Sequence, residues 1–112
     1  MKDLVDLTQM AWQAKQAELQ SIRRREALIR DALHALKDRQ SPAFQTESEA
    51  GDAGLLARAD LAWQRWKERE SRRLNIELAL VMAELAEGKA RTKRAFGRHQ
   101  VMQKLAQKID HI

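Results

Sequence analysis

The sequence contains no cysteine and no tyrosine, and it has one proline and four glycines among 112 residues. Without cysteine there are no disulfides and no thiol chemistry, and a reducing, cytoplasmic compartment is the expected location. With so little proline and glycine, long stretches carry no helix breaker. The sequence therefore leaves room for long, uninterrupted helices.

The chain also lacks a stretch of about 18 uncharged apolar residues, so we expect no helix that spans a membrane. Its first six residues include Asp3 and Asp6, where a secretory signal would need an apolar run. No targeting segment is expected.

Residues that could carry catalysis or bind a metal are scattered. His34, His99 and His111 do not have the spacing of metal ligands on a helix, and Gly51 and Gly54 lack the Lys-Ser/Thr of a phosphate-binding loop. We therefore expect no enzymatic activity, no metal and no cofactor.

Apolar residues recur at steps of three and four along two stretches, separated by a turn-rich acidic segment. Hydrophobic residues make up 44% of the chain and charged residues 33%, which is typical of long charged helices and coiled coils. The first stretch has the predicted buried positions Leu4, Leu7, Ala11, Ala14, Ser21/Ile22, Leu28/Ile29, Ala32 and Ala35/Leu36. The second has Leu56, Ala59, Ala62, Trp66, Leu74, Leu78, Val81, Leu85, Ala95, Met102, Ala106 and Ile109.

These patterns predict an all-α fold, in which a single domain over residues 1–112 forms a long antiparallel two-helix coiled-coil hairpin. The predicted elements are a helix over 3–40, a loop over 41–53 and a longer second helix over 54–110. Asp3 is a candidate N-cap, and Pro42 ends the first helix. Thr46 with Glu49, or else Ser48 or Asp52, are candidate caps of the second helix.

A turn centred near residue 47 or 48 predicts that facing residues have numbers adding up to about 95. Trp66 then faces Ile29, Trp63 faces Ala32, and Trp12 faces the run Ala79, Ala83 and Ala86. Glu18 and Arg25 interrupt the apolar seam. Either their charged ends reach water at its edge, or Arg25 pairs with Glu70 opposite.

The same register leaves the second helix without a partner beyond about Arg91 to Ala95. Its last fifteen to twenty residues, roughly 25 to 30 Å of helix, then project past the first. The alternative is a break at Gly97, where the chain could fold back into a three-helix bundle.

Positive charge is concentrated in this last segment. Residues 89–112 carry seven basic groups and one acidic group, whereas the rest of the chain sums to −1. An acidic partner is therefore expected to bind near the C-terminal end. Nucleic acid is a less favoured partner, because acidic residues are interleaved with Arg23 to Arg25 and with Arg72 and Arg73, and Phe96 is the segment's single aromatic residue.

The second stretch resembles a known family of proteins. Residues 63–69 (WQRWKER), 74–79 (LNIELA) and 93–98 (KRAFGR), with Leu105 beyond them, are similar to the flagellar export protein FliJ and its virulence-system counterpart YscO. The resemblance implies a protein like the central stalk of a rotary ATPase, which links the ATPase ring of a type III export system to the membrane export gate and to export chaperones. Either the flagellar or the virulence system fits, with the protein in the cytoplasm or peripheral at a membrane export apparatus.

The resemblance also implies two binding surfaces. The end that enters the ATPase ring would comprise Leu4, Leu7, Lys89, Arg91, Lys93, Arg94, Arg98, Lys104 and Lys108. The surface for the export gate and chaperones would comprise Leu55, Ala59, Ala62 and Trp66. Two other functions remain open: a hairpin that dimerises into a four-helix bundle, and a nonspecific nucleic-acid binder whose affinity falls steeply with salt.

Overall fold

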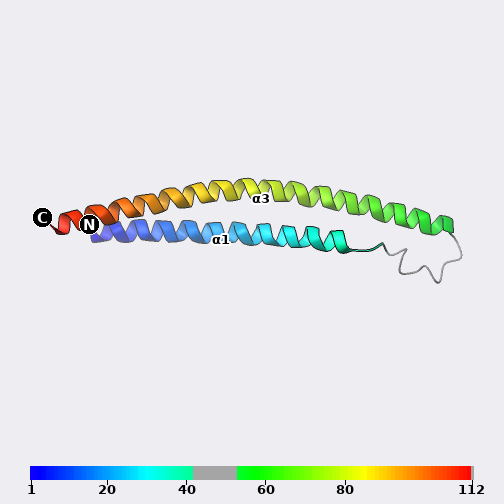
Figure 1. Cartoon of the computed structure of the whole chain (residues 1–112), viewed down its shortest axis with the longest axis horizontal. Coiled ribbons are helices and arrows are strands. Elements are labelled where there is room, and N and C mark those ends of the chain that lie inside the picture. Colours follow the sequence, from blue (N-terminus) through cyan, green and yellow to red (C-terminus); the bar gives the residue numbers. More distant parts are fainter. Residues whose placement is uncertain (42–52, 112) are drawn as a thin grey trace. The chain divides into compact units, whose positions relative to one another are not determined.

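The structure, a computed structural model, describes residues 1–41 and 53–111. Within these residues it contains the helices α1 (Lys2–Asp38) and α3 (Ala53–Asp110), shown in Figure 1. The predicted all-α hairpin with a longer second helix is confirmed. Asp3 lies in the first turn of α1 rather than at its N-cap, and the cap candidates Thr46, Ser48, Glu49 and Asp52 lie outside the described residues.

The helices pack as two compact units. Unit 1 joins Met1–Glu26 of the N-terminal segment to Leu80–Ile112, and unit 2 spans Ala27–Ala79. Within each unit a piece of α1 lies antiparallel to a piece of α3. In unit 1 the first turns of α1 therefore lie beside the last turns of α3 (Figure 1).

Both helices are continuous for reasons visible in their sequences. α1 contains neither glycine nor proline, and alanine, leucine, glutamine and arginine, which favour helix, dominate it. α3 runs without interruption through Gly88 and Gly97. The alternative of a break at Gly97 is therefore wrong.

The buried side of α1 is displaced by one residue from the predicted one. Its less exposed positions follow a strict three-four spacing: Val5, Thr8, Trp12, Lys15, Leu19, Ile22, Glu26, Ile29, Leu33 and Leu36. Leu4, Leu7, Ala11 and Ala14 were predicted to be buried, but they are exposed. The displacement partly buries Trp12 in place of Ala11, which removes more apolar area from water, and it brings the Thr8 hydroxyl to 3.0 Å from His99 Nδ1.

The register also differs from the predicted one. In unit 1, Thr8 bonds to His99, Lys15 lies opposite Thr92, and Arg25 pairs with Glu84. The numbers of these facing residues add up to between 107 and 109, not 95. The sequence position midway between facing residues therefore lies near the start of α3, and not in the middle of the predicted loop.

The new register overturns the predicted overhang at the C-terminal end. Ala95 and His99 are both buried, and the ring of Trp12 lies 4.9 Å from that of Phe96. The C-terminal segment of α3 is thus covered by the N-terminal turns of α1 within unit 1. Trp12 packs against these side chains, and not against Ala79, Ala83 and Ala86 as expected.

In unit 2 it is the beginning of α3 that extends past α1. Lys67 Nζ lies 3.2 Å from the carbonyl oxygen of Lys37, and the Arg39 guanidinium lies over the Trp66 ring. The turns of α3 before Trp63 therefore lie beyond Asp38, the last residue of α1 (Figure 1). The predicted pairings of Trp66 with Ile29 and of Trp63 with Ala32 are consequently wrong.

Among the described residues, neither helix contains a segment apolar enough and long enough to cross a membrane.

Candidate functional site

A continuous surface along one side of unit 1 combines most of the residues predicted for the ATPase end. Arg25 and Glu84 flank the seam on this side, and steps of seven residues from them reach Ala11 and Leu4 on α1 and Arg98 and Leu105 on α3. We call this surface the terminal face and define it by these residues: Leu4, Leu7, Ala11, Arg91, Arg94, Arg98, Val101 and Leu105.

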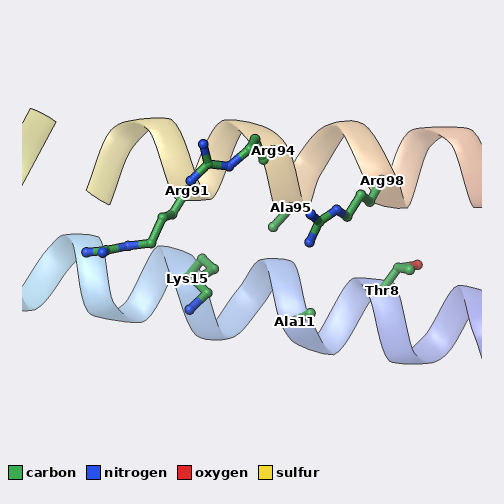
Figure 2. A pocket seen from close by; sticks show the side chains of 7 residues that line it. All are labelled: Thr8, Ala11, Lys15, Arg91, Arg94, Ala95 and Arg98. Atoms are coloured by element: carbon green, nitrogen blue, oxygen red, sulfur yellow. The ribbon is translucent and has the colours of Figure 1, made fainter. Parts of the chain in front are cut away.

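A cleft between the two helices opens on the terminal face. It has a volume of about 270 Å³ and is lined by Thr8, Ala11, Lys15, Arg91, Arg94, Ala95 and Arg98. Figure 2 shows Arg91 and Arg98 reaching from α3 toward α1, with Ala95 between them. Four cationic side chains from two helices thus surround the small side chains of Ala11 and Ala95.

These cations have few acidic neighbours. Lys15 lies 3.5 Å from Glu18, and Arg91 lies 4.0 Å from Glu87. Within the described part of the chain, Arg94 and Arg98 form no ion pair. The cleft is therefore a region of positive potential open to solvent.

A second, apolar recess adjoins the cleft. It is lined by Thr8, Arg94, Gly97, Arg98, Val101 and Met102. A Cβ atom at Gly97 would meet no atom within 4 Å, so the recess is open at this position. Leu4, Leu7, Val101 and Leu105 are exposed nearby on the same face, Leu7 by 60%.

Beneath the terminal face lies a polar contact that sequence reasoning missed. His99 is only 4% exposed, and its Nδ1 lies 3.0 Å from Thr8 Oγ1. The Thr8 hydroxyl donates to the Val5 carbonyl at 2.9 Å, so His99 Nδ1 is the donor to the hydroxyl oxygen. The His99 ring also stacks on Trp12, with 5.7 Å between centroids.

Arg25 and Glu84 form an ion pair between the two helices of unit 1. The hydrogen bond from Arg25 lowers the pKa of the Glu84 carboxyl, and the charges of Arg25 and Arg91 act in the same direction. Glu84 was not singled out in the sequence, because the expected register placed Glu70 opposite Arg25. The only signal in the sequence was an opposite charge two heptads after Glu70.

Glu70 instead pairs within α3. Arg73 bonds to Glu70 at 2.8 Å and to Glu77 at 2.7 Å. The hydrogen bond from Arg73 lowers the pKa of Glu70, and the same bond raises the pKa of Arg73. This is a local network on the helix surface and does not fix the register.

Unit 2 contains a second cluster, formed by two tryptophans of α3 that lie beside the C-terminal end of α1. The Trp63 and Trp66 rings are 6.5 Å apart and both are half-buried. Lys67 lies over Trp63 at 5.1 Å and Arg39 lies over Trp66 at 5.3 Å, so each ring carries a cation on its face. Both rings are therefore partly covered by neighbouring side chains.

The remaining predicted residues lie as follows. All seven basic residues of the C-terminal segment are exposed, and by helical position Lys108 points to the terminal face, whereas Lys89, Lys93 and Lys104 point to other sides of α3. Leu55, Ala59 and Ala62 are exposed, and Trp66 is half-buried. The described residues form no group of histidine, cysteine, aspartate and glutamate side chains that could hold a metal ion.

A scan of family models and searches of curated proteins and of solved structures gave no match to this chain. The candidate sites are therefore argued from their own geometry.

Proposed function

We propose that the protein is a non-enzymatic coiled-coil interaction protein of the stalk type, which links the ATPase ring of a type III or flagellar export system to the export gate and its chaperones. Its proposed location is the cytoplasm, at the base of the membrane export apparatus. The proposal rests on the resemblance of α3 to the FliJ and YscO proteins and on the terminal face of unit 1.

The single observation that carries the proposal is the joint end formed by the two termini. Exposed leucines of α1 and exposed arginines of α3 share one face of a continuous antiparallel helix pair. A paired helical end of this kind suits insertion into a ring lined by acidic residues, with electrostatics giving orientation and speed of association.

The second proposed contact lies on unit 2. Leu55, Ala59 and Ala62 follow a four-three spacing on the part of α3 that extends past α1, and Leu55 is 63% exposed. We assign this surface to the export gate and chaperones.

A pull-down with an export ATPase tests the first contact. The variant Leu4→Asp/Leu105→Asp/Lys108→Glu changes exposed side chains that point to the terminal face and removes no side chain from the core of unit 1. We expect its recovery of the ATPase to fall at least about tenfold below that of the unchanged protein. Deleting the chain from Lys89 onward is a poorer test, because it would also remove Ala95 and His99 from the core.

The matched control is Arg23→Glu/Arg24→Glu, which alters exposed residues on another side of α1. This variant should retain ATPase binding apart from a modest effect of net charge. If both variants recover as much ATPase as the unchanged protein, the proposed contact is wrong.

One observation favours a second candidate, a homodimerising hairpin. Large apolar side chains of unit 2 are exposed, among them Leu28, Leu61 and Ile76, each by more than half. A second copy could cover them. This candidate predicts a stable dimer in solution, whereas the stalk proposal predicts a monomer.

A further inference from the structure

The basic cleft of unit 1 contains more positive charge than the neighbouring carboxylates neutralise. Four cations, Lys15, Arg91, Arg94 and Arg98, surround it. Among the described residues, Lys15 pairs with Glu18 and Arg91 pairs with Glu87, and Glu84 is close enough to Arg91 for its charge to act on it. These two ion pairs are long, exposed and formed within one helix, so they contribute little to folding. Like charges placed together on a helix pair oppose folding because they repel one another. A bound anion would offset this repulsion, so the cluster indicates a ligand site.

We propose that this cleft is a binding site for a polyphosphate chain, either free or as the phosphate tail of a nucleotide. The floor of the cleft is made by Ala11 and Ala95, whose small side chains leave room for a ligand between the two helices. Its volume of about 270 Å³ is slightly below that of pockets for drug-sized molecules, about 300 Å³ and above. A compact anion fits this size.

The chemistry of the side chains favours phosphate. Three of the four cations are arginines, whose planar guanidinium groups donate paired hydrogen bonds to phosphate oxygens. Arg91, Arg94 and Arg98 follow a three-four spacing, so they lie along one side of α3 and can contact successive phosphate groups. Lys15 approaches from α1, and a chain of phosphates thus bridges both helices.

Bridging has a structural consequence. The ligand would neutralise charges on both helices of unit 1 at once, and it would bind the folded pair and not the separated helices. Binding therefore stabilises unit 1 by an amount that rises with the logarithm of the ligand concentration once that concentration exceeds the Kd. This inference does not depend on the proposed export function.

Isothermal titration calorimetry with sodium tripolyphosphate, without magnesium and at low salt, tests the site. ATP is the second arm, and sodium sulfate at equal ionic strength is the comparison anion. We expect one site per chain for tripolyphosphate and at least about tenfold weaker binding of sulfate, because a single tetrahedral anion cannot contact all four cations. Equal binding of ATP and tripolyphosphate would assign recognition to the phosphates alone, as proposed.

Two pairs of variants separate the cleft from the general charge of the protein. Arg94→Gln/Arg98→Gln should weaken tripolyphosphate binding at least about tenfold, whereas Arg23→Gln/Arg24→Gln, with the same loss of charge, should change it less than about threefold. Ala11→Glu places a carboxylate in the floor of the cleft and should abolish binding, and Ala17→Glu, on an exposed side of α1, should not. Circular dichroism would verify the helix content of each variant.

Three results would overturn the proposal. They are absence of tripolyphosphate binding to the unchanged protein at low salt, equal weakening by the two arginine variants, and equal weakening by the two glutamate variants. A failed ATPase pull-down would leave the calorimetric result unaffected, so the two proposals can fail separately.

Discussion

At the scale of single residues, the pair of Arg25 and Glu84 is the clearest determinant of register in unit 1. Both side chains are about half exposed, so the pair contributes orientation more than stability. Its effect is selective: sliding α3 by one heptad in either direction would place Glu77 or Arg91 opposite Arg25. The shift to Arg91 brings like charges together, which disfavours that register.

The pair predicts a pH dependence. The pKa of Glu84 is lower in the folded protein than its ordinary value of 4.5, so its stabilisation is present above that value and is lost as the pH falls through the lower, folded pKa. Urea unfolding followed by circular dichroism should show a loss of stability below pH 4.5 that is smaller in Glu84→Gln. Glu87→Gln, on a neighbouring turn, is the control. Identical pH profiles for Glu84→Gln and the unchanged protein would contradict the assignment.

Trp12 and His99 show what could and could not be predicted from single residues. Their types and their helical positions were readable, and the tryptophan was expected in the core. The partner of each depends on the register. The assumed turn centre predicted that facing residue numbers add up to about 95, which is at least twelve less than the observed sums. Burial of His99 became visible only when Thr8 was known to face it.

At the scale of the helices, two glycines of α3 have opposite surroundings. A Cβ at Gly97 would meet nothing within 4 Å, whereas one at Gly88 would lie 3.2 Å from a methyl group of Ile22 and 3.3 Å from one of Leu19. Gly88 therefore permits close packing of α1 against α3. Gly97 has no such role and carries only the conformational cost of glycine in a helix.

These surroundings predict opposite effects on stability. Gly97→Ala should raise the free energy of unfolding by about 0.5 to 1 kcal/mol, because it lowers the entropy of the unfolded chain without a clash. Gly88→Leu should lower it by about 1 to 3 kcal/mol, because its side chain overpacks the seam. Urea denaturation measures both. A loss of stability in Gly97→Ala would mean that another side chain fills the space beside Gly97, which would contradict the open surroundings described above.

The existence, type and approximate bounds of both helices followed from periodicity and from the scarcity of glycine and proline. The buried side of α1 did not, because pairs such as Leu28 and Ile29 offer the same apolar pattern in two phases. The phase that is buried depends on which side chains of α3 lie opposite, and therefore on the register, which a one-dimensional pattern does not contain. The terminal face includes residues predicted for the ATPase end, although those of α3 were expected on a projecting arm.

At the scale of the whole molecule, charge and apolar exposure favour different assemblies. The chain carries a net charge of +5, with the excess in residues 89–112, which opposes association of two copies through their terminal ends. The exposed apolar residues of unit 2 favour association. The balance between these effects decides whether the protein is a monomer, as the stalk proposal requires, or a dimer.

We expect the stalk form, and therefore a monomer of 12.9 kDa by light scattering at micromolar concentration and physiological salt. Raising the salt screens the repulsion between cationic ends and is the condition most favourable to a dimer. A stable dimer that persists on dilution at low salt would count against the stalk and for the four-helix assembly.

The pairing of the first turns of α1 with the last turns of α3 also determines when unit 1 can form. Thr8 and His99 are 91 residues apart in sequence, and the loop between them must close before their bond exists. During synthesis on the ribosome, the segment Met1–Glu26 has no partner until the residues after Leu80 have been made, whereas unit 2 is already complete by Ala79. Unit 2 can thus fold first and bring the remaining ends together, while the nascent N-terminal segment stays available to chaperones until translation is nearly finished.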